Sequence, residues 1–208
     1  MIQYKTVDIL AWRRLKPFPK QLKKFLFGIG SATLLFVFLL FGSRHLLLQA
    51  DRKTEAPWRQ IRRLVQRQLD LVSELTLLVA NAPPEFAKPL RLLKETDQAF
   101  RQKHEAIAHS TSVTQSQLRE YETAHRVMTT SVERVVRTWP GASANQFQEW
   151  LGCYWGVQKL LRTEEARYNV SASSYNRLYG TFFLSWVAEK FKMHNRPTFK
   201  ETERHHGR

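Results

Sequence analysis

The chain has 208 residues, a net charge of +15 and a single cysteine. One cysteine excludes an intrachain disulfide and a cysteine-based zinc site. The positive charge indicates an anionic partner, and membrane lipids are favoured over nucleic acid because no nucleic-acid recognition motif accompanies the charge.

Residues 1–24 form a basic segment ahead of an apolar run. Its first sixteen residues mix aliphatic and aromatic side chains with basic ones, so an interfacial amphipathic helix and a frayed tail are both consistent with it. Pro17 and Pro19 separate this stretch from the apolar run. The basic residues expected at the membrane surface are Arg13, Arg14, Lys16, Lys20, Lys23 and Lys24.

Residues 25–43 contain no charged side chain. At ~1.5 Å rise per residue, a helix of this length is long enough for a ~30 Å hydrocarbon layer. A secretory signal peptide is the alternative, but its apolar region is usually about 7–15 residues, and the sequence Gly42-Ser43-Arg44 is a poor cleavage site. The run therefore predicts a single transmembrane helix.

The flanking charges bear on the orientation of this helix. Seven Lys and Arg precede it and six follow within twenty residues. The denser cluster abuts the N-terminal end, which favours an N-terminus in the cytoplasm under the positive-inside rule.

Residues 44–201 show apolar residues at steps of three and four, without strand alternation, which is typical of helices in a bundle. The first stripe runs from Trp58 to Val79. We expect the membrane helix to run on towards it, with a kink at Pro57.

Two further helices follow. A break precedes the second helix, which ends near His109, and residues 110–115 form a Ser/Thr loop. The third helix ends at the sequence Trp139-Pro140-Gly141. The prolines that mark the break before the second helix are Pro83, Pro84 and Pro89.

The fourth helix is predicted to be the longest of those in the domain. Asn145 and Gln148 have the spacing of an N-cap and its capping-box partner. The apolar stripe reaches Phe182, and the pattern extends to Phe191. The prediction is therefore an all-α protein, with one N-terminal transmembrane helix, an up-and-down antiparallel bundle of long helices and a polar tail at 202–208.

Catalytic and metal-binding motifs are not found in the sequence. The seven histidines are scattered and lack the i, i+4 spacing of a zinc-protease helix. A phosphate-binding glycine loop and a serine elbow are also missing. We expect no catalytic site, no metal site, no cofactor and no enzymatic activity, with Cys153 a small apolar filler.

The strongest polar signal is a repeat in the fourth helix, Tyr168-Asn169 and Tyr175-Asn176. Two helical turns place both tyrosines on one face and both asparagines on the next. A polar network between helices, formed around buried tyrosine hydroxyls, is favoured over a ligand or partner site, and both interpretations stay open.

Gln158 and Glu165 interrupt the apolar stripe of the same helix, and a polar group there needs a partner. The arginine-rich first helix could supply one, and we predict a pair between Glu165 and Arg67 or Arg63. The candidates for a polar core or partner site are Tyr168, Asn169, Tyr175, Asn176, Gln158, Glu165, Arg67, Asp70 and Trp58.

Residues 44–201 resemble the LemA family of bacterial membrane-anchored helical proteins. Four motifs in family order carry the resemblance. They are Trp58-x-Gln60-Ile61 with Arg67 and Asp70-Leu71; Trp139-Pro140 with Ala144-Asn145 and Phe147; Tyr168-Asn169-x5-Tyr175-Asn176; and Phe182 with Val187-Ala188, Phe191, Pro197 and Phe199. Gln158 and Glu165 depart from the family, which usually has Glu and Arg there.

The resemblance implies a bundle fold, a bacterial inner membrane and no established reaction. Some members of the family look like scaffolds, and a MamQ-like branch is tied to forming the magnetosome membrane. We therefore expect a membrane-anchored, non-enzymatic scaffold or assembly protein that binds lipid headgroups or an unidentified membrane-proximal protein. A factor that forms an organelle membrane and a sensory accessory protein are the alternatives, and self-association into a homo-oligomer stays open.

Overall fold

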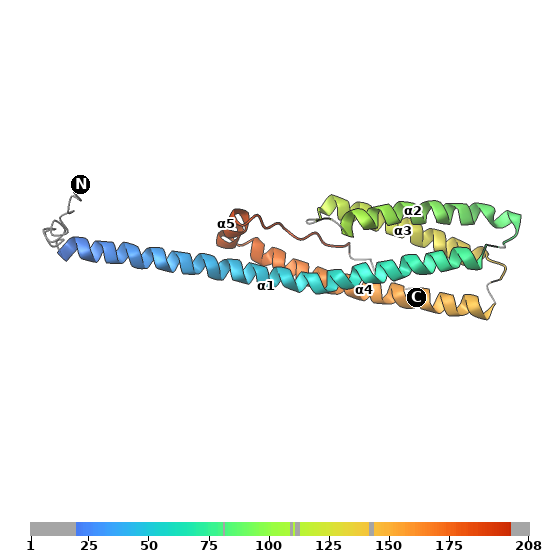
Figure 1. Cartoon of the computed structure of the whole chain (residues 1–208), viewed down its shortest axis with the longest axis horizontal. Helices are drawn as coiled ribbons and strands as arrows, with labels where there is room; N and C mark the ends of the chain where they lie inside the picture. Colours follow the sequence, from blue (N-terminus) through green and yellow to red (C-terminus); the bar gives the residue numbers. More distant parts are fainter. Residues whose placement is uncertain (1–19, 81, 109, 111–112, 142–143, 201–208) are drawn as a thin grey trace, which may run out of the picture. The chain divides into compact units, whose positions relative to one another are not determined.

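Helices make up most of the described part of the chain (Figure 1). The computed structural model describes residues 20–80, 82–108, 110, 113–141 and 144–200. No strand occurs among these residues, which confirms the all-α prediction. The elements are α1 (Lys20–Leu78), the 3-10 turn η2 (Pro84–Phe86), α2 (Ala87–Ala108), α3 (Gln115–Thr138), α4 (Asn145–Tyr179) and α5 (Phe182–Lys190).

The 59-residue helix α1 contains both the uncharged run and the first bundle helix, with Pro57 inside it. The chain divides into two units, residues 1–42 and residues 43–208. In the first unit, the large apolar side chains of the run are exposed around the helix, as expected of a surface that faces lipid. Over Phe27–Leu78, α1 is the one helix of the described residues long and apolar enough to cross a membrane.

The second unit is an up-and-down bundle. Consecutive helices from α1 to α4 run in opposite directions (Figure 1), as predicted. Each contributes an apolar stripe to one core, because the three-four spacing places these side chains on a single helix face. Fully buried examples are Val65, Val72 and Leu75 of α1, Leu93 and Phe100 of α2, Leu118 and Val132 of α3, and Tyr154 and Leu161 of α4.

A polar side-chain cap begins α3, and Trp139 ends it. The Thr114 hydroxyl accepts a hydrogen bond from the Gln117 N–H at 3.2 Å, and the Gln117 side chain accepts one from the Thr114 N–H at 2.8 Å. This reciprocal pair is a capping box at the end of the predicted Ser/Thr loop. The C-cap of α3 is Trp139, as the sequence indicates.

The predicted ends of α4 are wrong at both termini. Its N-cap is Ala144, which has no side-chain acceptor, and Asn145 is already the first helical residue. At the other end, α4 stops at Tyr179 and α5 is a separate helix. The C-cap is Gly180, and the Thr181 hydroxyl donates to the Leu178 carbonyl at 2.8 Å, so a carbonyl of the last turn has a partner outside the helix. Phe182 is consequently 93% exposed and not part of the buried stripe.

Candidate functional site

The Tyr-Asn repeat of α4 holds the C-terminal strap, the non-helical segment of residues 193–200. The Asn169 amide donates to the Phe199 carbonyl at 3.0 Å and accepts from the Phe199 N–H at 2.9 Å. Asn176 makes the same two bonds with Arg196, at 2.7 and 2.8 Å. Each amide thus satisfies both backbone groups of one residue, as a neighbouring strand would.

The strap is also held by α3. The Gln115 amide donates to the Thr198 carbonyl at 2.9 Å and accepts from the Thr198 N–H at 3.0 Å, while Glu122 accepts from the Lys200 N–H at 2.6 Å. The sequence interpretation missed both residues. They lie about eighty positions from their partners, and only the backbone of the strap is recognised.

Side chains of the strap are held mainly by α1. The Arg196 guanidinium donates to both carboxylate oxygens of Asp51, at 2.6 and 2.9 Å, and hydrogen bonding to Asp51 raises the pKa of Arg196. The Phe199 ring lies 6.1 Å from the Trp58 ring and 5.6 Å from the Tyr168 ring, between centroids. Trp58 and Tyr168 were both predicted site residues, and their rings pack against the Phe199 ring of the strap.

The hydroxyls of Tyr168 and Tyr175 do not form the expected network. None of the hydrogen bonds between described residues involves either hydroxyl. Both rings are buried, and burial raises the pKa of each tyrosine to about 12. In this half of α4, the asparagines rather than the tyrosines make the polar contacts.

A polar network does lie in the core, about three to four turns from Tyr168 towards the start of α4. The Tyr154 hydroxyl accepts from the Gln158 amide at 3.2 Å and from the Gln68 amide of α1 at 3.3 Å. The oxygen of Gln68 lies 2.8 Å from Nε2 of His125 on α3. Burial lowers the pKa of His125 to about 4, so the ring is neutral at pH 7 and can donate this bond. Gln158 was a candidate, whereas its partner Tyr154 and the more distant member His125 were not recognised as parts of a network.

Glu165 does not pair with Arg67 or Arg63. Arg67 donates to Glu74 at 3.2 Å along the surface of α1, and no ion pair between described residues joins Glu165 to that helix. Burial first, and then the nearby Glu122 carboxylate, raise the pKa of Glu165 to about 7 against a smaller lowering by Arg162. The predicted pair is therefore wrong. The apolar stripe shows which face of α1 turns inward, but it does not show which neighbouring helix each residue of α1 contacts.

The remaining predicted residues lie at surfaces or outside the described part. The Asp70 carboxylate accepts from the Gln66 amide at 3.0 Å on exposed α1. Of the predicted membrane-surface residues, Lys24 is exposed. Arg13, Arg14 and Lys16 lie outside the described residues, as do the side chains of Lys20 and Lys23.

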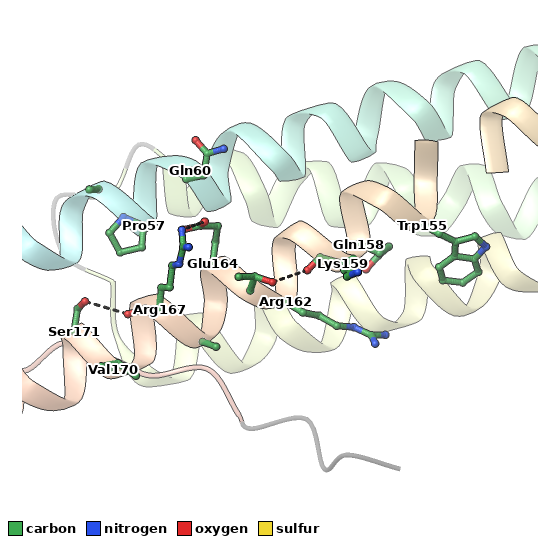
Figure 2. Close-up of a pocket in the computed structure, with 13 residues that line it drawn as sticks. Pro57, Gln60, Trp155, Gln158, Lys159, Arg162, Glu164, Arg167, Val170 and Ser171 are labelled. Carbon is green, nitrogen blue, oxygen red and sulfur yellow. Dashed lines mark hydrogen bonds and ion pairs between the residues drawn. The ribbon is translucent and has the colours of Figure 1, made fainter. Parts of the chain in front are cut away.

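A groove lies between α1 and α4 and has a volume of about 1320 Å³ (Figure 2). Pro57, Trp155 and Val170 supply apolar surface. The lining residues are Ala56, Pro57 and Gln60 of α1, and Trp155, Gln158, Lys159, Arg162, Thr163, Glu164, Ala166, Arg167, Val170 and Ser171 of α4.

The groove is cationic as well as apolar. Arg167 pairs with Glu164 at 2.8 Å, drawn in Figure 2. Lys159 and Arg162 form no ion pair with any described residue, so two positive charges remain to attract an anionic group. Gln158 is the only predicted site residue in the lining. The alternation of basic and apolar residues along this face of α4 could have revealed the rest.

Within the described ranges, no cluster of three or more His, Cys, Asp or Glu side chains could hold a metal ion. No protein-family model matches the chain, and a search among curated proteins finds no match. The likeness to the LemA family therefore rests on the four sequence motifs.

Proposed function

We propose that the protein is a membrane-anchored, non-enzymatic scaffold or assembly protein, and that the groove between α1 and α4 binds an acidic, partly apolar segment of a partner protein. The groove carries this proposal. The groove combines apolar side chains with two cations, Lys159 and Arg162. Neither cation has an ion-pair partner among the described residues. Amphipathic segments bind in grooves of this composition.

The position of the groove along α1 favours a protein over lipid headgroups. Pro57 follows Ser43, the last residue of the uncharged run, by fourteen residues. At ~1.5 Å per residue this is roughly 20 Å along the helix. The headgroup region adds only about 5–8 Å on each side of the hydrocarbon core. Measured along α1, the distance from the uncharged run to the groove therefore exceeds the thickness of the headgroup region.

The membrane itself is assigned from the resemblance and the flanking charges. LemA-like proteins are anchored in the bacterial inner membrane, and the basic cluster before residue 25 favours an N-terminus in the cytoplasm. An extraction test checks the anchor. The full-length protein should stay with the membrane through high-salt and alkaline washes and need detergent for release, and release by the washes alone would refute the anchor.

Photo-crosslinking tests the groove. Val170, 69% exposed in the groove, is replaced by a photoreactive phenylalanine derivative in the full chain. Leu77, 76% exposed near the end of α1 and outside the groove lining, is the matched control. In native membranes we expect a protein adduct from position 170 only, mapped by mass spectrometry to an acidic segment.

A charge exchange makes the test specific. Reversing Lys159 and Arg162 to glutamate should abolish the adduct, and reversing acidic residues in the captured segment should restore it. Identical adducts from positions 170 and 77, adducts only with lipid, or adducts unaffected by the reversal would each contradict the proposal.

A further inference from the structure

The short helix α5 presents aromatic side chains outward. Its opposite side buries Val187 and Ala188 completely. Such a concentration of exposed aromatic surface marks a contact with a protein or a membrane. The exposed aromatic residues of α5 and its first following position are Phe182 at 93%, Phe183 at 36%, Trp186 at 40% and Phe191 at 42%.

One contact fixes the level of α5 along α1. The Arg44 guanidinium carbon lies 5.1 Å from the centroid of the Phe191 ring, a cation–π contact. Arg44 is the first charged residue after the uncharged run and directly follows Ser43. If residues 25–43 fill the hydrocarbon layer, Arg44 lies among the headgroups. Phe191 and the end of α5 then lie there too.

The short length of α5 keeps it near the level of Arg44. In Figure 1 α5 is foreshortened while α4 runs across the picture, so the axis of α5 crosses that of α4. Nine residues at ~1.5 Å each make a helix about 14 Å long, which keeps its aromatic residues close to the level of Arg44. A short aromatic helix at this level is suited to the headgroup region.

The charges near α5 fit anionic headgroups. Lys190, Lys192 and Arg44 lie at this end of the bundle, against the single acid Glu189 of α5. Each well-placed cation adds attraction to an anionic leaflet. Aromatic rings with flanking lysines are the composition found at membrane interfaces.

We propose that α5 is a second membrane contact, a short aromatic helix that inserts at the headgroup and acyl boundary of the same bilayer that holds residues 25–43. The inference rests on the membrane anchor of the proposed function. The span is the tether of the bundle, and α5 adds a second point of contact with the same bilayer. The break at Gly180 and Thr181 separates α5 from α4, so α5 takes a direction of its own.

Spin labels in the full chain test the contact. Replacing the lone Cys153, which is exposed, by serine gives a background for one nitroxide at a time. Labels are placed through Phe182→Cys, Phe38→Cys in the span, and Leu77→Cys, roughly 50 Å along α1 from Ser43. The protein is reconstituted in vesicles of phosphatidylcholine with phosphatidylglycerol, and collisions with oxygen and with a water-soluble nickel chelate are compared.

We expect labels at positions 182 and 38 to collide preferentially with oxygen, which concentrates in lipid, and a label at 77 to collide preferentially with nickel. Nickel preference at 182 with oxygen preference at 38 overturns the α5 contact and leaves the anchor intact. Nickel preference at 38 overturns both. Spectral broadening at 182 that disappears on dilution with unlabelled protein shows a second copy instead of lipid and also overturns the contact.

A second variant guards against an effect of the label itself. With the label moved to Phe183→Cys, adding Phe182→Glu should convert oxygen preference to nickel preference. Phe182 is almost fully exposed, so this substitution leaves the core unaltered. Unchanged oxygen preference would contradict insertion through this face.

Discussion

Tyr154 lies in the first half of α4, Tyr168 and Tyr175 lie in the second, and all three rings are buried. In the first half, the Tyr154 hydroxyl accepts from two amides and belongs to the core network with Gln68 and His125. In the second half, the side-chain amides of Asn169 and Asn176 bind the backbone of the strap. The rings of Tyr168 and Tyr175 contribute apolar surface only. In α4, a buried tyrosine hydroxyl thus belongs to a polar network only where a side-chain amide lies within hydrogen-bonding distance of it.

The two halves also differ in what they stabilise. The core network joins α1, α3 and α4 at the centre of the bundle, so its loss affects unfolding of the whole bundle. The asparagines hold a non-helical segment, whose release is a local opening with a smaller free energy. The following substitutions separate these two contributions, from the largest expected effect to the smallest.

Tyr154→Phe should destabilise the bundle by about 2–3 kcal/mol, because two buried amide donors lose their shared acceptor. Thermal unfolding of the full-length protein in detergent, followed by circular dichroism, measures the change. A loss below that of Tyr168→Phe would contradict the assignment of the network to the first half.

Asn169→Ala and Asn176→Ala should each weaken the strap by about 1–2 kcal/mol through two lost backbone hydrogen bonds. Hydrogen exchange should accelerate roughly tenfold at the N–H groups of Phe199 and Arg196, respectively, while the melting temperature falls less than for Tyr154→Phe. Ser174→Ala, an exposed change on the same helix that does not touch the strap, is the control. Equal exchange in all variants would show that the amides do not hold the segment.

Glu165→Gln should stabilise the bundle by about 1–2 kcal/mol at pH 8. The pKa of Glu165 is raised from 4.5 to about 7 in the folded state, so ionisation costs stability as the pH rises through this interval. The difference from wild type should be complete above pH 7 and vanish near pH 4.5. Denaturant unfolding at a series of pH values measures it, and a gain independent of pH would point to another cause.

Tyr168→Phe should change stability by less than about 0.5 kcal/mol, because its hydroxyl makes no hydrogen bond with a described residue and the ring stays in place against Phe199. Removal of a tyrosine hydroxyl should thus lower stability strongly in the first half of α4 and very little in the second half. A loss comparable to that of Tyr154→Phe would show that the second half also contains a hydroxyl-centred network.

Much of the fold could be predicted from the sequence, because proline and glycine mark the breaks and the three-four stripe marks the buried faces. The Tyr-Asn repeat was also recognisable as a polar feature. Its partner was not, because Asn169 and Asn176 bind backbone groups, and backbone recognition leaves no residue-type pattern in the strap. The error over Glu165 has a different origin, since a periodic stripe does not specify which neighbouring helix each position faces.

The strap also has a consequence for biosynthesis. Arg196, Thr198 and Phe199 connect α1, α3 and α4, and they follow all three helices in the chain. A ribosome therefore makes α1, which contains the candidate membrane span, well before it makes the strap. The contacts between the strap and the helices can form only after all three helices have been synthesised.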